Sequence, residues 1–437
     1  MLSFFRKYTP DIVFRGYHRV RSSHAARKHG FPAKGMIVVG ITGTKGKTST
    51  ANYVWSVLHA GGYKAGLLSS ANFRIGEKEF SNPYHMTMPD PYLVQKKLRE
   101  MREATVEVVV VEMTSEGMKQ FRHLGIPVDI AIFTNLTPEH LTSHKGSFEK
   151  YKQAKAPLFR DALAHPVRTL RGRPVPRSII ANADSEHAPY YLQFPADTKI
   201  TYGIDSGELR AEHVHGAHNG VSFSIGTQRY VLSIPGTFNV YNALPAIAVG
   251  GLLGISDADV AKGLESLAVI PGRMEEISAG QPFRLFVDYA HEPASLGAVL
   301  HAARALVPAE GNVVLLMGGQ GGGRDWRKRE PMAKLAAELA DYVVVTNEDP
   351  YDDDPRAIVQ ELSTGVAKYG KREGENLFAL LDRREGIHKA LSLAHKNDIV
   401  VITGKGAEET MMVKGGAIAW NERAIVRELA THYAHLN

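Results

Sequence analysis

Short apolar runs alternate along this chain with longer stretches in which apolar residues recur at helical spacing. In the first half, one run rich in Val and Ile starts at Met36, and three others cover residues 106–113, 128–135 and 178–183. A helical stretch covers residues 51–59. Continuous apolar runs are typical of strands that helices cover on both faces, as in parallel sheets. The first half is therefore predicted to be an α/β domain.

The same alternation returns beyond residue 270. Strands are predicted at residues 283–287, 312–317, 342–346 and 398–403, and helices at 294–306 and 332–340. Strands that alternate with helices in both halves imply two parallel sheets. The predicted fold class is α/β, with a P-loop-type parallel-sheet central domain followed by a second, Rossmann-like domain.

Between the two halves the pattern is less regular. Residues 198–235 break into short alternating segments with Gly, which indicates a small antiparallel region, and residues 239–263 are helical again. The Arg-rich stretch 168–177 is interpreted as a solvated loop. Pro271 and Gly272 are a plausible hinge between domains.

A chain of 437 residues is too long for one ordinary core. We divide it into a basic N-terminal arm (1–35), a central domain (36–270) and a C-terminal domain (271–437). The arm mixes apolar and basic residues and is predicted to be an amphipathic helix packed on the central domain. Contact with a membrane surface through residues 1–30 is the minority interpretation.

The distribution of net charge along the chain indicates which classes of partner to expect. The formal net charge is +6, from 52 Lys and Arg against 46 Asp and Glu, and residues 1–30 alone carry seven bases and one acid. The rest of the chain is therefore neutral overall, and no nucleic-acid partner is expected. The absence of Cys excludes disulfides, thiolate metal sites and a cysteine nucleophile, and it fits a cytoplasmic location. No stretch reaches the ~18 apolar residues of a membrane-spanning helix.

The strongest local signal is the loop after the first strand. It consists of Gly43, Thr44, Lys45, Gly46, Lys47, Thr48 and Ser49. Successive N–H groups at a helix N-terminus can cradle the phosphates of a nucleotide. Lys47 would neutralise the β- and γ-phosphates and the Thr48 hydroxyl would ligate Mg²⁺. The general pattern has Gly where Ile41 stands, but the strand–loop–helix placement favours nucleotide binding over a turn that only packs.

Polar residues follow the next two strands. Glu112 closes the second strand, and Asn135 closes the third, five residues before His140. Ligands bind where parallel strands end, so Glu112 and His140 could meet near the phosphate loop as ligands of a second Mg²⁺. Taken singly, each residue is better explained as a solvated or capping side chain, and the spacing alone does not establish that the two meet.

With these pieces assembled, the chain resembles the Mur ligase family, and most closely its tripeptide-synthesising members. The resemblance covers residues from about 36 to the C-terminus. It rests on the blocks 42–49, 111–115, 134–136 with 140–141, 151–159, 236–243, 271–275, 287–291, 322–325 with 328–329, and 404–406.

The resemblance implies an ATP-dependent ligase that joins an amino acid to a UDP-N-acetylmuramoyl peptide through an acyl phosphate, with two Mg²⁺ ions. Lys155 matches a lysine that carries a carbamate and helps to hold the second Mg²⁺ beside Glu112 and His140. The catalytic set it implies is Lys47, Lys155, His140 and Glu112, and the metal set is Thr48, Glu112, His140 and Lys155. Other matched positions lie at the nucleotide: Asn135, Asn242, Arg273, Asp288 and His291. Positions matched to the incoming amino acid are Arg324, Asp325, Lys328, Glu348, Asp349, Tyr351, Gly404 and Glu408.

Departures from the family pattern leave the acceptor open. Only 36 residues precede the first motif here, whereas the tripeptide synthetases carry a UDP-binding domain there. Residues 139–142 are Glu-His-Leu-Thr where the family has Asp-His-Leu-Asp. Residues 114–116 are Thr-Ser-Glu where the family has Ser-Ser-His. The final Gly-Lys-Gly-His-Glu block ends in Ala407 and Glu408. The alternatives are a ligase of the same chemistry on a cyanophycin-type or folylpolyglutamate-type acceptor, or a non-catalytic nucleotide-binding scaffold.

Residues 348–351, which align with the family's block that selects the incoming amino acid, predict the amine substrate. Diaminopimelate-selecting relatives place Arg where this chain has Tyr351, and five carboxylates surround that position: Glu348, Asp349, Asp352, Asp353 and Asp354. Such a cluster favours an amino acid with a cationic side chain, lysine or ornithine before arginine. The alternative is that most of these acids form the solvated N-terminus of a helix starting near Pro355.

Overall fold

The computed structural model describes residues 11–84, 86–139, 141–161 and 163–434. The chain forms two units. The first comprises the residues up to Val214 together with Phe223–Val231 and Val240–Leu267, and the second comprises His215–Ser222, Leu232–Asn239 and the residues from Ala268 onward. Each unit is built on its own sheet.

The first unit is built on a nine-stranded sheet in the order β11-β10-β9-β6-β1-β5-β2-β3-β4. Its strands are β1 (Ile37–Thr42), β2 (Ala65–Leu68), β3 (Asn72–Ile75), β4 (Lys78–Ser81), β5 (Val108–Glu112), β6 (Ile130–Phe133), β9 (Ser178–Asn182), β10 (Thr198–Gly203) and β11 (Leu209–Arg210). β1 pairs in parallel with β5 and β6, and all three strands are fully buried, as continuous Val/Ile runs predict. Their carboxyl ends therefore meet at one edge.

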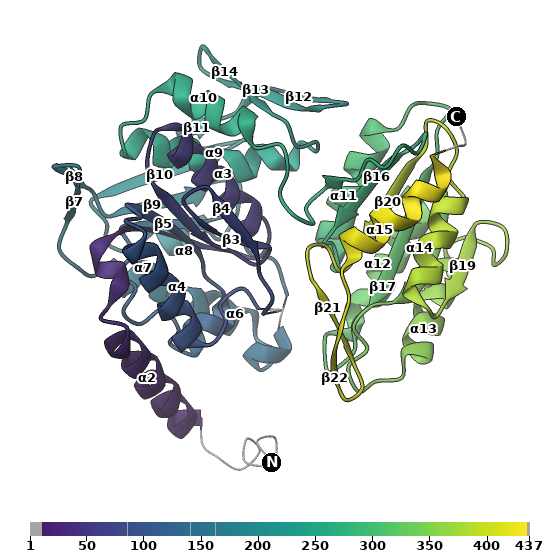
Figure 1. The fold of residues 1–437 in the computed structure, drawn as a ribbon, viewed down its shortest axis with the longest axis horizontal. Helices are drawn as coiled ribbons and strands as arrows, with labels where there is room; N and C mark the ends of the chain where they lie inside the picture. The colour runs from purple at the N-terminus through teal and green to yellow at the C-terminus, as the bar shows by residue number, and fades with distance from the viewer. Residues whose placement is uncertain (1–10, 85, 140, 162, 435–437) are drawn as a thin grey trace. The chain divides into compact units, whose positions relative to one another are not determined.

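Helices surround this sheet (Figure 1). They are α2 (Asp11–Lys28), η1 (Pro32–Gly35), α3 (Lys47–Ala60), α4 (Pro91–Glu103), α5 (Ser115–Lys119), η2 (Leu141–His144), α6 (Phe148–Lys155), α7 (Pro157–Arg160), α8 (Ala188–Leu192), α9 (Phe238–Leu252) and α10 (Asp257–Ser266). α10 packs on α3, because Gly263 lets the α3 backbone approach: a Cβ there would lie 2.7 Å from the Cα of Val57. The helix expected over residues 239–263 is in fact two helices, with Gly254 (φ 70°) between them.

The helix expected in the N-terminal arm is present as α2, which packs against α4. Arg21 forms an ion pair with Asp90, and His24 Nδ1 lies 2.7 Å from the Tyr92 hydroxyl. The part of the arm before residue 11 lies outside the described residues. No helix within the described ranges is long and apolar enough to cross a membrane.

Two expectations for the middle of the chain are wrong. Residues 168–177 are not a simple solvated loop but a hairpin, β7 (Arg168–Leu170) with β8 (Arg173–Val175), because Arg168 pairs with the fully buried Asp129. Asp129 also accepts a hydrogen bond from the Val38 amide (2.7 Å), so this carboxylate draws the segment onto the sheet. β10 is not part of an antiparallel region, since it extends the main sheet parallel to β9. A separate three-stranded sheet holds β12 (Glu212–Ala217), β13 (Gly220–Ile225) and β14 (Gln228–Leu232).

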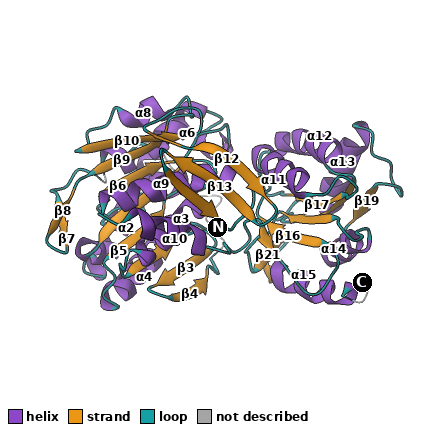
Figure 2. Cartoon of the chain, turned by 90° about the horizontal axis from the view of Figure 1, so that it is seen from above, coloured by secondary structure: helices purple, strands orange, loops and turns teal. Residues whose placement is uncertain are grey.

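The second unit has a six-stranded sheet in the order β15-β16-β20-β17-β18-β19. Its strands are β15 (Glu275–Glu276), β16 (Arg284–Asp288), β17 (Val313–Gly319), β18 (Tyr342–Asn347), β19 (Leu377–Leu380) and β20 (Ile399–Thr403), and a hairpin pairs β21 (Thr410–Val413) with β22 (Gly416–Ala419). Its helices are α11 (Pro293–Leu306), η3 (Trp326–Lys328), α12 (Arg329–Leu339), α13 (Pro355–Lys368), α14 (Arg383–Ser392), α15 (Glu422–Ala430) and η4 (Thr431–Tyr433). Figure 2 shows α11, α12 and α13 on one face of this sheet and α14 and α15 on the other.

The strands from β16 to β19 are parallel, so their carboxyl ends share one edge. Arg383 ties this edge together: its guanidinium donates to the carbonyls of Thr403 (2.7 Å) and Asn347 (3.1 Å) and pairs with the buried Glu422. The predicted α/β fold class, with parallel sheets in both halves, is confirmed.

Candidate active site

The phosphate loop leads from β1 into α3 and depends on two glycines. A Cβ on Gly43 (φ 152°) would lie 1.9 Å from Thr134 Oγ1, and one on Gly46 (φ 79°) would lie 2.2 Å from Asn242 Oδ1. Gly46 is the N-cap of α3, and the first turn of that helix contains no acidic residue. The loop therefore presents backbone N–H groups and the positive end of the helix dipole to an anion.

Asn135, at the end of β6, holds this loop in place. Its Oδ1 accepts from the Lys45 amide (2.9 Å), its Nδ2 donates to the Lys45 carbonyl (3.2 Å), and its own carbonyl accepts from the Thr44 amide (2.8 Å). Lys45 also forms an ion pair with the buried Glu139 at 2.9 Å. The structure thus brings Asn135 to the loop, where its contacts fix the backbone conformation.

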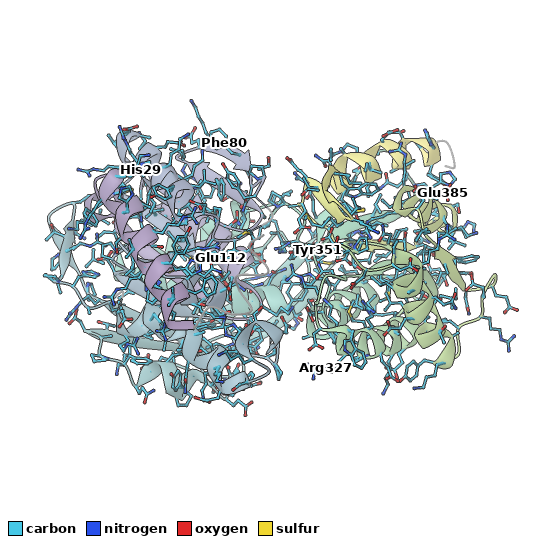
Figure 3. All side chains as sticks on the ribbon, turned by 90° about the horizontal axis from the view of Figure 1, so that it is seen from below. His29, Phe80, Glu112, Arg327, Tyr351 and Glu385 are labelled. Carbon is cyan, nitrogen blue, oxygen red and sulfur yellow. The ribbon has the colours of Figure 1, made fainter. Side chains whose placement is uncertain are left out.

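Glu112, at the end of β5, lies beside the first turn of α3. The Thr48 hydroxyl donates to Glu112 Oε2 (3.0 Å), and the Ser70 amide donates to the same oxygen (2.8 Å). Ser70 Oγ lies 2.5 Å from Thr87 Oγ1. Figure 3 labels Glu112 in the first unit. Two of the predicted metal ligands, Thr48 and Glu112, are therefore in direct contact.

Lys155, the last residue of α6, is 1% exposed and lies under the same loop. Its Nζ donates to the Gly43 carbonyl (2.8 Å) and lies 4.5 Å from the centre of the Tyr151 ring. The Tyr151 hydroxyl is 3.1 Å from Thr44 Oγ1. Burial, reinforced by the nearby Lys47 ammonium, holds the pKa of Lys155 well below its ordinary value, which favours the neutral amine. Lys47 itself donates to the Thr44 carbonyl at 2.8 Å.

The donors at this site fit magnesium. Hydroxyl and carboxylate oxygens are the ligands that Mg²⁺ prefers, and it commonly takes only one or two protein ligands beside substrate phosphates. No cluster of three His, Asp or Glu side chains able to hold a metal occurs among the residues that the structure describes. His140, the remaining predicted ligand, lies outside those residues.

Arg273, Asp288 and His291 come together in the second unit, where β16 ends. Asp288 accepts hydrogen bonds from the amides of Met274 and Ala290, both at 2.7 Å. The guanidinium of Arg273 lies 4.5 Å from the centre of the Tyr289 ring. His291 Nδ1 is 2.7 Å from the carbonyl oxygen of that tyrosine.

A buried lysine organises the acids at the next strand ends. Lys405 Nζ pairs with Asp349 (2.8 Å) and Glu408 (2.6 Å), and Glu408 also accepts from the Tyr289 hydroxyl (3.1 Å). Although burial alone would lower it, the pKa of Lys405 is raised because the carboxylates of Glu408 and Asp349 stabilise the ammonium. No role for Lys405 is predicted from the sequence, since its ion pair with Asp349 joins residues 56 positions apart along the chain.

Glu348 has no such partner. It is 1% exposed, and neither of its carboxylate oxygens has a hydrogen-bond partner in the part of the chain that the structure describes. A Cβ on Gly404 would lie 2.5 Å from Glu348 Oε2, so glycine is required there. Burial raises the pKa of Glu348 to about 7, against the opposing effect of Arg383.

Tyr351, labelled in Figure 3, adopts a left-handed backbone conformation (φ 53°), and its hydroxyl accepts from Arg324 at 3.1 Å. Asp325 caps η3, and Lys328 pairs with Glu292 at 3.0 Å. The five-carboxylate cluster predicted around Tyr351 is divided: Glu348 and Asp349 are buried, whereas Asp352, Asp353 and Asp354 are exposed. Asp354 caps α13, as the helix-terminus alternative expects.

Residues 41–250 match the Mur ligase middle domain, and residues 272–406 match the Mur ligase, glutamate ligase domain. The chain is 36% identical over 412 residues to a UDP-N-acetylmuramyl-tripeptide synthetase of Roseiflexus sp. (strain RS-1), covering 92% of this chain and 80% of that protein. It is 33% identical over 427 residues to a UDP-N-acetylmuramoyl-L-alanyl-D-glutamate--2,6-diaminopimelate ligase of Bacillus cereus, covering 97% and 84%.

Solved structures share the fold. A UDP-N-acetylmuramoyl-L-alanyl-D-glutamate--2,6-diaminopimelate ligase superimposes with a TM-score of 0.62 at 24% identity, covering 98% of this chain and 84% of that one. A folylpolyglutamate synthase of Mycobacterium tuberculosis, complexed with ADP and AMPPCP, gives a TM-score of 0.71 at 19% identity, with 96% and 95% covered. At these identities the structural likeness speaks for the fold alone.

Proposed function

The chain belongs to the Mur ligase family, and from this premise we propose that it is an ADP-forming acid–amino acid ligase that uses ATP to add an amino acid to a UDP-N-acetylmuramoyl peptide in peptidoglycan synthesis. Relatives at 33–36% identity are named as a UDP-N-acetylmuramyl-tripeptide synthetase and a UDP-N-acetylmuramoyl-L-alanyl-D-glutamate--2,6-diaminopimelate ligase, and they are matched over more than nine-tenths of this chain. The observation that carries the proposal is the contact of Thr48, Glu112 and Lys155 with one phosphate loop. A cytoplasmic location, where ATP is available, is part of this proposal.

The phosphate loop would hold ATP. Its N–H groups bind the phosphates, and the Lys47 ammonium, now 2.8 Å from the Thr44 carbonyl, would turn to the γ-phosphate. Magnesium bound by Thr48 and Glu112 would offset the negative charge that builds up between carboxylate and phosphate. Asn135 and Asn242, which contact or approach the loop backbone, would keep it in its binding conformation.

Lys155 would act as a carbamate. A neutral, buried amine can attack CO₂ and lose a proton, which turns a cation into an oxygen ligand. The lowered pKa of Lys155 favours the neutral amine, and the contact of its Nζ with the Gly43 carbonyl supports a role for the carbamate at the phosphate loop. We propose that this carbamate, together with Glu112 and His140, holds a second Mg²⁺.

The reaction then follows from the chemistry of a carboxylate, which is a poor electrophile. A carboxylate oxygen of the acceptor attacks the γ-phosphorus, ADP leaves, and an acyl phosphate forms. The amine of the incoming amino acid attacks the acyl carbon, loses a proton, and expels phosphate to leave an amide. Water must be excluded while the acyl phosphate exists, because hydrolysis would waste ATP.

The second unit would bind the incoming amino acid, which we propose has a cationic side chain. The support is Glu348, a buried carboxylate whose oxygens have no hydrogen-bond partner among the described residues. An ammonium or guanidinium would stabilise its charged form, since leaving it unpaired is costly. Asp349 is already neutralised by Lys405, so the argument rests on Glu348 rather than on the whole acidic cluster.

Tyr351→Arg should shift the amine preference toward diaminopimelate. The new guanidinium can pair with the distal carboxylate, and one charge-assisted bond is worth about 1.5–3 kcal/mol, or about tenfold or more in relative kcat/KM. A competition assay with lysine and meso-diaminopimelate measures this ratio, and Tyr351→Phe, which removes only the hydroxyl bound by Arg324, is the matched control. A wild-type preference for diaminopimelate, or an unchanged ratio in Tyr351→Arg, contradicts the cationic assignment.

The proposed function is tested by phosphate release over a matrix of acceptors and amino acids. We expect release only when a UDP-N-acetylmuramoyl peptide and an amino acid are both present, with the amide product seen by mass spectrometry. Release with a folate or cyanophycin-type acceptor instead would keep the chemistry and replace the acceptor. No release with any pair would favour a nucleotide-binding scaffold.

A further inference from the structure

A groove of about 1110 Å³ lies between α2 and the segment from α5 to α7. Seven Lys and Arg side chains line it against two acids, Glu116 and Asp161, which leaves a formal excess of five positive charges. Three Phe side chains complete its walls. All of these residues belong to the first unit.

Both acids are already occupied. Asp161 pairs with its neighbour Arg160 at 2.8 Å, and Glu116 lies 3.8 Å from Lys119. By contrast, among the side chains that the structure describes, no carboxylate lies within ion-pair distance of Arg19 or Lys150. Arg15 lies 5.8 Å from the centre of the Phe121 ring. Like charges gathered without counter-charges repel one another, so the groove is suited to an anion carrying more than one charge.

One end of the groove is close to the phosphate loop. His144 lines the groove, and its ring centre lies 5.2 Å from that of Tyr151. The Tyr151 hydroxyl in turn is 3.1 Å from Thr44 Oγ1. Two buried side chains, His144 and Tyr151, therefore separate this end of the groove from the loop.

We propose that this groove binds the diphosphate of the acceptor, a nucleoside diphosphate ester. The inference rests on the proposed function for the identity of the acceptor and on the groove for its location. A diphosphate diester carries two negative charges, which Arg15 and Arg19 can bind through paired N–H groups, and the Phe121 ring offers a face for the base. Binding at this remote part of the acceptor positions the carboxylate for attack.

Charge reversal at single groove positions tests the proposal with UDP as the probe. Arg19→Glu and Lys150→Glu should each weaken UDP binding in calorimetric titrations by about tenfold and leave ADP binding unchanged. Arg27→Glu is the matched control, because Arg27 is an exposed residue of the same helix outside the groove. The control should change neither affinity by more than about twofold, a small effect expected for a remote screened charge.

Kinetics with the full chain separate this proposal from the function on which it rests. In Arg19→Glu the KM for the acceptor should rise about tenfold, with kcat and the KM for ATP unchanged. Equal UDP affinity in Arg19→Glu, Lys150→Glu and Arg27→Glu would overturn the groove assignment even if ligation proceeds. If the wild type ligates no acceptor, the UDP titrations still decide the groove. A loss of binding to anionic phospholipid vesicles without a loss of UDP binding would assign the cations to a membrane surface and refute the proposal.

Discussion

Lys47→Ala is expected to lower kcat by about 10²- to 10³-fold while the protein stays folded, because losing one well-placed charge donor at a phosphoryl transition state costs about 3–4 kcal/mol. Lys47 is the first residue of α3, and its ammonium now donates to the Thr44 carbonyl, so the substitution removes one local hydrogen bond. Stability should fall by only about 1 kcal/mol. Steady-state phosphate release and thermal unfolding measure the two effects.

Lys262→Ala is the control for Lys47→Ala. It removes the same charge from an exposed position on α10 and should leave both turnover and thermal unfolding unchanged. ATP-dependent ligation at wild-type rate in a folded Lys47→Ala variant would contradict the role given to the phosphate loop.

Lys155→Ala should lower activity by at least about 10²-fold, and short carboxylates such as acetate or formate should restore part of it. The expected loss corresponds to the stabilisation of negative charge in the transition state that the second Mg²⁺ would provide. Removing the side chain also empties space beneath the loop, where an added carboxylate can take the place of the carbamate. The measurement is the ligation rate against carboxylate concentration at saturating Mg²⁺.

Two variants separate the carbamate from packing. Lys155→Met keeps most of the side-chain volume without an amine and should be inactive, folded and poorly rescued, because the space is filled. Lys152→Ala, on the same helix, removes an ion pair with Glu149 and a cation–π contact with Tyr190, and it should stay active. Full activity of Lys155→Ala without added carboxylate would rule out the carbamate.

Local patterns in the sequence predicted much of the fold. Continuous Val/Ile runs identified β1, β5 and β6, and the glycines of the phosphate loop placed it between β1 and α3. The prediction of a solvated loop at residues 168–177 was wrong, because the charge of this Arg-rich stretch does not reveal the buried partner of Arg168. Asp129 is 39 residues away along the chain, so only folding brings the two side chains together.

The candidate site was harder to predict where contacts depend on folding. Ser70 donates to Glu112 because β2 pairs with β5, and no motif surrounds Ser70 in the sequence. In the sequence, Lys405 is recognisable only as part of the Gly-Lys-Gly block at residues 404–406. Its ion pair with Asp349 neutralises that carboxylate and not the carboxylate of Glu348. Burial, which the composition of a loop does not reveal, separates Glu348 from the exposed acids that follow it.

Transfer of ¹⁸O from the acceptor carboxylate is the most direct measurement of the central claim, ligation through an acyl phosphate. The acceptor is labelled in its reacting carboxylate, ligation is run with ATP and the amino acid, and the released phosphate is analysed by mass spectrometry. The oxygen that attacks the γ-phosphorus leaves with that phosphorus when the amine displaces phosphate, so each amide formed should yield one phosphate that carries one carboxylate oxygen. Amide formation with unlabelled phosphate would contradict the account.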